Sequence, residues 1–424
     1  MNTSVSVLTD RACTLLGLGV AVSFLSTAAL ASNPNPEWDD QWPTNEAGFL
    51  TNHQQLTSAD QFIKAGESYF SHDGSRIIFQ GIPVPAKGDE TLEHYMMYVC
   101  DVVRDDDGNI TGVEHMTNLS SWGSSNTCGW FHPKDSSRVL FGTTLVAPGG
   151  DKVAGFQRDS SKYSWQFPRE MEIVEMKLTK AEGTCCAEMG LSKAKPIWER
   201  DGYDAEGSWS PDGRFILYTQ LEAGGTDGDL WIYDSKKKTH TALVAQAGYD
   251  GGPFFSPDGK SICYRSDRRG DKLLQVYVAK LAFGKGGTVT GISEEIQITD
   301  NEHVNWCPFY TPDGKYLFYA TSEMSHANYE VFCIDATGEY PLDETPRMRI
   351  TDAKGFDGLP AFSADGKTMI WTAQRGELRG DEGRPSSQLW VADIDLDAVD
   401  QAYTALREAM IEKKEEDSFE NYMP

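Results

Sequence analysis

The chain has 424 residues and an acidic composition, with 64 Asp and Glu against 38 Lys and Arg, a net charge of −26 and a pI of about 4.6. Binding to nucleic acid or to anionic lipid needs a basic surface, so this composition argues against both kinds of partner. It is compatible with high solubility and with a basic or cationic partner.

Residues 1–31 have the pattern of a secretory signal peptide. An apolar run over Leu15–Leu25 is followed by Ala29-Leu30-Ala31, which fits a small-residue cleavage site. A membrane anchor is the alternative, but the apolar run is shorter than the roughly 20 residues that cross a bilayer. We therefore predict a cleaved signal, export, and no membrane insertion of the mature chain.

Residues 32–48 form the predicted N-terminal arm, whose aromatic residues, Trp42 among them, are expected to pin it to the folded domain. The run Phe49–Thr57 that follows resembles Ile296–Thr299, which precedes one of the repeats described below. An outer strand that precedes the first repeat has no sheet of its own. We therefore predict that it completes the last sheet, near Leu389–Val391, and leaves no exposed edge.

A short turn motif recurs along the chain, each time between two apolar runs. In the copy Ser256-Pro257-Asp258-Gly259, the proline suits a turn through its fixed φ, the aspartate can accept hydrogen bonds from its own backbone, and the glycine supplies a positive φ. Each copy is therefore predicted as the turn of a β-hairpin. The other copies begin at Ser71, Phe131, Ser210, Thr311 and Ser363, and the one at Phe131 is degraded.

The spacing of these motifs, mostly about 45–55 residues, is typical of a repeat architecture in which no single sheet can bury its own face. Radial stacking of such sheets forms a β-propeller. The motif resembles the WD40-like repeat of the TolB-like propeller family, and its six copies match the six blades of that family. The resemblance implies an all-β fold, a six-bladed β-propeller over residues 49–395, and a location in the bacterial periplasm. It is to the repeat family and not to TolB itself, whose separate N-terminal α/β domain has no counterpart in this chain.

Two segments depart from the regular repeat. The second repeat carries an insertion over about residues 145–170, rich in Gly, Ser and aromatic residues, which is expected either to take part in binding or to pack over the rim. Residues 397–415 change to a helical period, with an apolar stripe from Val399 to Met410, and predict a short helix on the outside of the ring. The acidic residues after this helix, within 396–424, are predicted as a disordered tail.

Nothing in the sequence assembles a nucleophile with its base, and we expect no catalytic residues. The G-x-S-x-G motif of the hydrolase domain that accompanies some propellers of this type does not occur. Cysteine and histidine show no zinc-ligand spacing, and most cysteines are expected to be buried free thiols. Related propellers also act as polysaccharide lyases that use histidine around a metal, and eight scattered histidines leave that alternative open.

The most suggestive pattern lies where each inner strand begins, as in Gly248-Tyr249-Asp250-Gly251. Because inner strands line the channel of a propeller, the repeat symmetry predicts a ring of polar side chains at one mouth. Converging carboxylates raise one another's pKa unless a cation lies among them, so a divalent ion such as calcium, or a Lys or Arg of a partner, would fit there. The alternative is turn chemistry alone, in which each Asp bonds to nearby backbone N–H groups. The candidates are Glu67, Asn126, Asp204, Asp250, Asn305 and Asp357 in the ring, with Glu206, His303 and Trp306 beside it.

Together these patterns predict an exported, monomeric, non-enzymatic propeller scaffold that binds a protein or peptide partner at one face of the ring. The alternative is a metal-dependent enzyme or a small-ligand binder, with carbohydrate as the ligand, that uses the acidic mouth. A catalytic site would need a proton-transfer group within about 3 Å of the reacting point, whereas a recognition surface needs only exposed aromatic and charged side chains.

Overall fold

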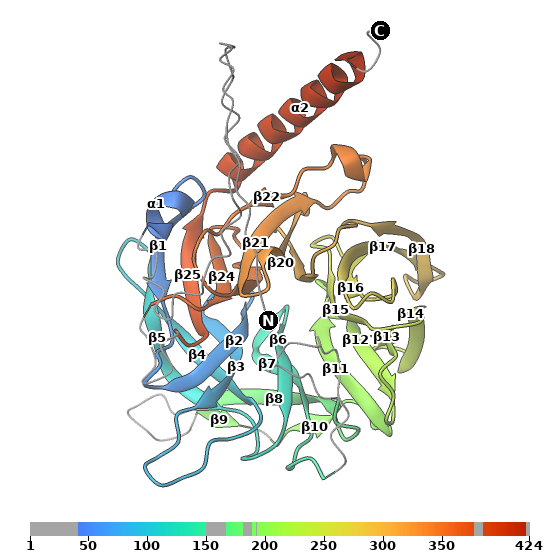
Figure 1. Ribbon diagram of the computed structural model, residues 1–424. Coiled ribbons are helices and arrows are strands. Elements are labelled where there is room, and N and C mark those ends of the chain that lie inside the picture. The colour runs from blue at the N-terminus through green and yellow to red at the C-terminus, as the bar shows by residue number, and fades with distance from the viewer. Residues whose placement is uncertain (1–40, 150–166, 181–188, 192, 377–384, 421–424) are drawn as a thin grey trace, which may run out of the picture. The chain divides into compact units, whose positions relative to one another are not determined.

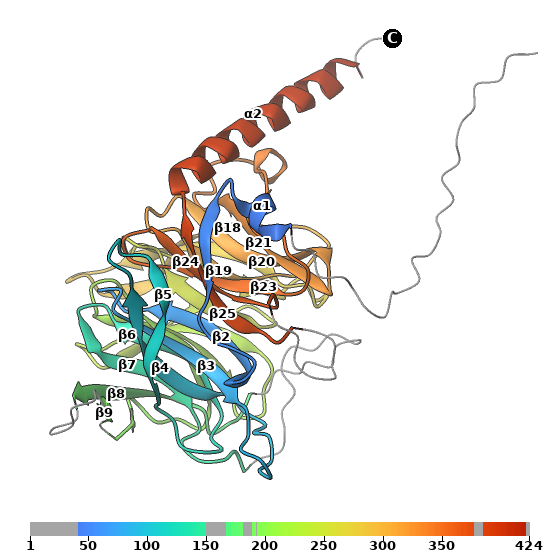
Figure 2. The ribbon, with the colours of Figure 1, turned by 90° about the vertical axis from the view of Figure 1, so that its left-hand side faces the viewer.

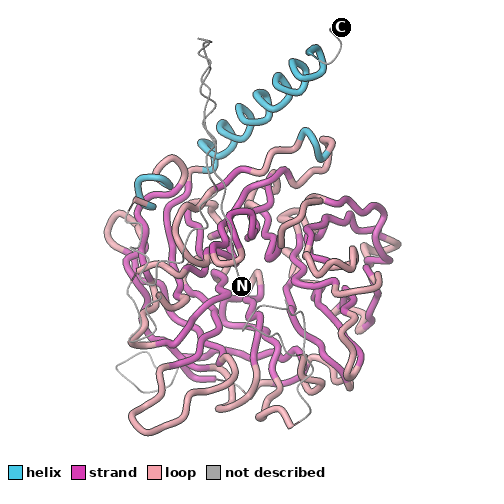
Figure 3. Tube along the Cα trace, viewed as in Figure 1, coloured by secondary structure: helices cyan, strands magenta, loops and turns pink. Residues whose placement is uncertain are grey.

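The computed structural model describes residues 41–149, 167–180, 189–191, 193–376 and 385–420. The predicted signal peptide, the arm before residue 41 and residues 150–166 of the insertion lie outside these ranges. In the described ranges most regular structure is strand (Figure 3). The helices are α1 (Trp42–Glu46), α2 (Leu396–Glu420) and the single turn η1 (Leu342–Glu344). No helix in these described residues is both long and apolar enough to cross a membrane.

Six antiparallel sheets surround a common centre, which confirms the predicted all-β, six-bladed propeller (Figure 1). We number the sheets blade 1 to blade 6 in chain order. The inner strands contact one another in a closed cycle. They are β2 (Phe62–Phe70), β6 (Asn126–His132), β11 (Gly202–Trp209), β15 (Asp250–Phe255), β19 (Asn305–Tyr310) and β23 (Asp357–Phe362). The second strands are β3 (Arg76–Pro83), β7 (Asp135–Thr143), β12 (Phe215–Glu222), β16 (Ser261–Ser266), β20 (Tyr316–Ser325) and β24 (Thr368–Ala373).

The outer half of each blade completes the sheet, and β2 to β5 of blade 1 lie side by side in Figure 2. The third strands are β4 (Met96–Arg104), β8 (Glu172–Lys180), β13 (Gly228–Asp234), β17 (Gln275–Phe283), β21 (Asn328–Asp335) and β25 (Gln388–Ile394). The fourth strands are β5 (Ile110–Asn118), β10 (Lys195–Pro196), β14 (Thr239–Val244), β18 (Val289–Gln297), β22 (Met348–Arg349) and β1 (Leu50–Gln55). In blade 2, β9 (Met189–Leu191) also pairs with β8.

The ring closes as the sequence predicts. Strand β1 is the outer strand of blade 6, although it precedes blade 1 in the chain. It pairs antiparallel with β25, Leu50 opposite Ile394 and Gln55 opposite Trp390. The first and last segments of the propeller are therefore held in one sheet, and Leu50 is fully buried there.

The recurring turn motif joins the first and second strands of each blade, as predicted. In the blade 4 turn, the Asp258 carboxylate accepts hydrogen bonds from Ser256 Oγ at 2.7 Å and from the Lys260 backbone N–H at 3.0 Å. Gly259 has a φ of +69°, which only glycine adopts without strain. We call the end of the ring that carries these turns the turn face, and the end where the inner strands begin the entrance face.

The hydrophobic core lies between neighbouring blades. One cluster joins Leu217 and Ile232 of blade 3 to Ile262 and Ala279 of blade 4, all of them buried. Each sheet therefore buries both faces against its neighbours, and a single blade would have no core of its own.

Helix α2 is longer than predicted. Val399 and Tyr403 are buried against the ring, at 0% and 3% exposure, whereas Leu406 on the same stripe is 40% exposed. The acidic residues 415–417 lie in the helix, so the prediction of a disordered tail there is wrong. Glu and Lys are good helix formers, and their propensity outweighs the mutual repulsion of the acidic charges.

Tyr403 fastens α2 to blade 5 through its hydroxyl group. The hydroxyl oxygen accepts a hydrogen bond from the Asp335 backbone N–H at 2.9 Å and donates one to the Pro346 carbonyl oxygen at 3.0 Å. Tyr403→Phe leaves both groups without this partner and is expected to lower the free energy of unfolding by about 1–3 kcal/mol. Leu406→Ala, in the exposed part of the stripe, should change it by less than about 0.5 kcal/mol. Urea denaturation of both variants measures the difference, and equal values would contradict this role.

Candidate functional site

Five of the six predicted ring residues occupy equivalent positions near the beginning of an inner strand. This equivalence follows from their pairing with the second strands, as in Asp204 with Gln220 and Asp250 with Ser266. All five are buried. They are Asn126, Asp204, Asp250, Asn305 and Asp357.

Each of the three carboxylates at this level is bound by a different arginine. Asp204 pairs with Arg200 at 2.8 Å, Asp250 pairs with Arg268 at 3.0 Å, and Asp357 pairs with Arg375. The two asparagines donate their amide hydrogens to backbone oxygens, among them Tyr95 O at 2.8 Å from Asn126 and His303 O at 3.2 Å from Asn305. The three carboxylates are therefore compensated inside the protein by arginines and not mainly by the backbone N–H groups that the turn-chemistry alternative names. Asn126 joins blade 2 to Tyr95 of blade 1.

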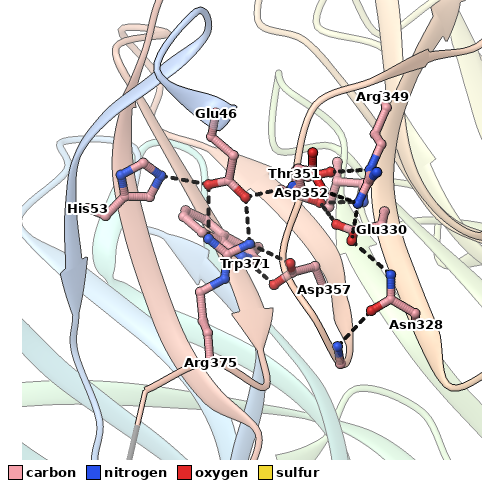
Figure 4. Close-up of polar contacts among 12 residues, drawn as sticks. Glu46, His53, Asn328, Glu330, Arg349, Thr351, Asp352, Asp357, Trp371 and Arg375 are labelled. Atoms are coloured by element: carbon pink, nitrogen blue, oxygen red, sulfur yellow. Dashed lines mark hydrogen bonds and ion pairs between the residues drawn. The ribbon is translucent and has the colours of Figure 1, made fainter. Parts of the chain in front are cut away.

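The N-terminal arm reaches this level at blade 6 (Figure 4). Glu46 of α1 is 1% exposed and accepts hydrogen bonds from both terminal nitrogens of Arg375, at 2.9 and 2.8 Å. The His53 ring lies 2.8 Å from the same carboxylate. Burial raises the pKa of Glu46, but the hydrogen bonds from His53 and Arg375 outweigh it and hold the pKa below its usual value.

Trp42 covers this ion pair. The Arg375 guanidinium lies 4.4 Å from the Trp42 ring and 5.3 Å from the Trp371 ring. Trp42 also contacts the Trp390 ring edge-on at 5.7 Å. The expectation that aromatic residues pin the arm to the propeller is thus met by Trp42.

A second buried acid, Glu330 of blade 5, lies beside the ion pair of Glu46 and Arg375 (Figure 4). Glu330 accepts hydrogen bonds from Arg349 and Thr351, both at 2.6 Å. Burial raises the pKa of Glu330 to about 8. The Asp352 backbone N–H, one residue beyond Thr351, donates to Glu46 at 2.8 Å. The arm therefore bridges blades 5 and 6.

The sequence predicted that Glu67 lies at the same level as Asp204 and Asp357, and this prediction is wrong. Glu67 lies at a β-bulge deeper in the channel, and the same bulge recurs in the inner strand of every blade. The bulged residue has a positive φ each time, between +46° and +58°. Such bulges re-aim a side chain, and here Glu67, Cys128 and Glu206 lie close enough to affect one another's pKa. The six residues are Glu67, Cys128, Glu206, Gly252, Cys307 and Leu359.

Glu206 is the best-bound group at the bulge level. Its carboxylate accepts hydrogen bonds from Tyr249 Oη at 2.5 Å, Thr219 Oγ1 at 2.8 Å and Arg265 Nη2 at 3.1 Å, and another from the Gly252 backbone N–H. Arg265 belongs to blade 4 and Glu206 to blade 3, so this pair joins two blades. Both side chains are 8% exposed.

Glu67 has weaker partners. Tyr69 Oη donates to its carboxylate at 3.5 Å. Burial raises the pKa of Glu67 above its usual value; the negative charge of Glu206 acts in the same direction, and a hydrogen bond with Cys128 opposes it. Burial also raises the pKa of the Cys128 thiol well above its usual value. Cys128 is therefore a poor nucleophile.

His303 and Trp306 lie at the entrance face in different roles. The His303 backbone oxygen accepts hydrogen bonds from Gln275 and Asn305. The Trp306 ring contacts Tyr329 at 6.5 Å and Phe356 at 5.9 Å between blades 5 and 6. Trp306 is thus part of an aromatic cluster between two blades.

Below the bulge level the channel is filled by an aromatic plug, which we define as Tyr69, Trp130, Phe254 and Phe309. The rings of opposite blades touch across the axis, Tyr69 with Phe254 at 5.5 Å and Trp130 with Phe309 at 6.0 Å. Tyr69 and Trp130 are 4.6 Å apart. In the sequence Tyr69, Phe254 and Phe309 lie two positions before the turn motif and Trp130 lies one position before its degraded copy. Their contact across the ring depends on the assembled bulges of the six inner strands.

A cavity of about 150 Å³, which we call the turn-side pocket, lies on the turn-face side of the plug. Aromatic rings from blades 1, 2, 5 and 6 form its walls, and exposed His72 and Ala364 lie at its rim. The wall residues include Tyr69, Phe70, Trp130, Phe131, Phe309 and Phe362. The pocket opens on the face opposite to the mouth that the sequence singled out.

The described residues hold no group of three or more His, Cys, Asp and Glu side chains arranged to bind a metal ion. Of the predicted candidates, Asp204, Asp250 and Asp357 face arginines, and Glu67 and Glu206 lie at the bulge level. The described cysteines 100, 128, 263, 307 and 333 are free thiols.

No family model matches the chain. It is 30% identical over 157 residues to Dipeptidyl-peptidase 5 of Porphyromonas gingivalis, a match that covers 32% of this chain and 22% of that protein. It is 24% identical over 188 residues to the Tol-Pal system protein TolB of Wolinella succinogenes, covering 43% and 40% of the two chains. The crystal structure of TolB from Acinetobacter baumannii matches 76% of this chain and 64% of that one, with 17% identity and a TM-score of 0.44.

The matches to the first two relatives span less than half of each protein. The six blades and the sequence similarity to TolB confirm the resemblance to the TolB-like propellers at the level of the fold.

Proposed function

We propose that this chain is an exported, monomeric propeller scaffold that binds a protein or peptide partner at the turn face. The partner places one apolar side chain in the turn-side pocket. The observation that carries this proposal is the pocket, an open space lined by aromatic rings at the centre of the turn face. Export to the bacterial periplasm is inferred from the pattern of residues 1–31 and from the resemblance to TolB.

The pocket has the properties of an anchor site. Its volume of about 150 Å³ is enough to hold several water molecules. These waters find few polar partners among the aromatic walls, so replacing them with one apolar side chain is favourable. Binding energy at protein interfaces is concentrated in such buried anchors.

Ala364→Trp tests this proposal. Ala364 is exposed and lies at the pocket rim, and the turn that holds it is fixed by the hydrogen bond from Ser363 Oγ to Asp365 at 2.6 Å. An indole there should fill or cover the pocket without altering the turn. The matched control is Ala327→Trp, the same change at an exposed position in the hairpin between β20 and β21, on the entrance face.

The binding partner for this test comes from a random-peptide phage library selected on the mature wild-type protein. Selected peptides are expected to share an apolar side chain and to bind wild type and Ala327→Trp with equal Kd in calorimetry. Ala364→Trp should weaken them by about tenfold or more. Failure to select any peptide, or equal binding to all three proteins, would place recognition elsewhere and overturn the proposal.

A further inference from the structure

An acidic groove adjoins the turn-side pocket. It has a volume of about 650 Å³ and lies beside the turns of blades 5 and 6 and the beginning of α2. Ala364 lines the pocket, and Asp365, the next residue, lines the groove. The blade 6 turn therefore lies between the two spaces, and an extended segment that leaves the pocket over this turn reaches the groove. The groove carboxylates are Asp313, Asp365, Asp393, Asp395 and Asp397.

The negative charge of the groove is compensated only in part. Lys315 attracts Asp313 and Asp397, and Lys367 and Arg104 attract Asp365, but these contacts are not close ion pairs. None of these five carboxylates forms an ion pair with another residue in the described part of the chain. Asp313 and Asp365 accept hydrogen bonds within their own turns, and Asp395 accepts one from the backbone at the start of α2. Lys315, in the same turn as Asp313, pairs instead with Asp400 at 3.1 Å.

We propose that the partner segment which fills the turn-side pocket is basic, with Lys or Arg side chains next to the apolar anchor that lie in the acidic groove. This inference rests on the proposed function and adds the chemistry of the partner. Opposite charges across an interface speed association and exclude wrong partners. A neutral segment would leave the excess negative charge of the groove in place and an acidic segment would add to it, whereas flexible lysines or arginines reach the carboxylates while the anchor stays in the pocket.

Synthetic peptides with one anchor and three kinds of flank test the inference. Each carries Trp, Phe, Leu or Met at its centre, and Lys, Gln or Glu residues on both sides, and its Kd is measured by fluorescence anisotropy with the mature protein. At about 0.01 M salt the Lys peptides should bind about tenfold more tightly than the Gln peptides, and the Glu peptides more weakly still. Near 0.15 M salt the Debye length falls from about 30 Å to about 8 Å, so the difference should shrink.

A double variant separates the groove from the general acidity of the chain. Asp393→Asn with Asp397→Asn removes two groove charges and leaves the turn and helix-start hydrogen bonds intact. Asn52 Nδ2, which donates to Asp393 at 2.6 Å, can still donate to the amide oxygen of the variant. The double variant should weaken the Lys peptides and leave the Gln peptides unchanged. The control, Asp106→Asn with Asp107→Asn, removes two charges from the exposed turn between β4 and β5, which does not line the groove, and should have little effect.

The outcomes distinguish this inference from the proposed function. If Lys and Gln peptides bind equally and Ala364→Trp abolishes both, the pocket is the site and the basic partner is wrong. If both double variants weaken the Lys peptides equally, attraction to the whole acidic protein explains binding and the groove assignment is wrong. If no peptide of any flank binds, both proposals fail.

Discussion

Arg375→Ala is expected to lower the free energy of unfolding by about 3–5 kcal/mol, because it leaves two buried carboxylates without their cation. The Glu46 side chain is 0% and the Asp357 side chain 2% exposed, and both pair with Arg375 (Figure 4). The change also removes the group that Trp42 covers. Chemical denaturation of the mature protein measures the loss.

Arg169→Ala is the control, since Arg169 pairs with Asp201 at the surface, where the two side chains are 53% and 65% exposed. Solvent screens this pair, so its loss should change stability little. Adding Glu46→Gln to Arg375→Ala should restore part of the loss, because one buried charge disappears. If Arg375→Ala costs no more than Arg169→Ala, the arm is not anchored by this ion pair.

The effect of Arg375→Ala should depend on pH. In the wild type the pKa of Glu46 is held below its usual value. The ion pair of Glu46 and Arg375 therefore stabilises the fold fully at a pH above that usual pKa, and less as the pH falls below it. Burial already raises the pKa of Asp357 in the wild type, although Arg375 opposes this. Without Arg375, burial should raise the folded-state pKa of Glu46 above its unfolded value and that of Asp357 further still. The two buried charges destabilise the variant until they become protonated. Arg375→Ala should therefore lower the free energy of unfolding more near about pH 8 than near about pH 5.

Local chemistry explains why the sequence was sufficient for the fold. The motif Ser256-Pro257-Asp258-Gly259 contains all the groups that make its turn, so each copy predicts a hairpin by itself. The closing strand β1 was predictable because it repeats the pattern of an outer strand where no blade precedes it. The anchoring role of Trp42 followed from an apolar side chain in an otherwise polar arm.

The candidate site was predictable only in part, because the bulges decide how deep in the channel each of its side chains lies. Asp204 and Glu206 are two residues apart, yet Asp204 is bound by Arg200 near the entrance face, and Glu206 at the bulge is bound by Arg265 of the next blade. Glu67 and Glu206 each lie six residues before the aspartate of their turn motif, whereas Asp204 lies eight residues before it. The prediction grouped Glu67 with Asp204 because it compared residue types at the beginning of the strand, where the bulge separates the two levels. The plug and the pocket, built from residues far apart in the chain, need the whole ring to be assembled.

Gly252→Ala is expected to destabilise the protein by about 4–6 kcal/mol through two effects. Gly252 has a φ of +58°, and a Cβ there would lie 1.6 Å from Arg265 Nη1 and 2.7 Å from its Cζ. Arg265 cannot remain in place, so it must give up its hydrogen bond to the buried Glu206. Gly224→Ala is the matched control, because Gly224 has a φ of +77° with open space around it, and it should show only the backbone cost of about 1–2 kcal/mol.

A double-mutant cycle with Arg265→Ala separates these two effects. If the clash with the guanidinium dominates, Gly252→Ala should cost about 4–6 kcal/mol in the wild type and no more than Gly224→Ala once Arg265 is gone. An equal cost in both backgrounds would mean that the backbone conformation alone requires glycine. The first result would explain why blade 4 has glycine at the bulge where the other blades have Glu, Cys or Leu: its place at the axis is taken by Arg265, which joins blade 4 to Glu206 of blade 3.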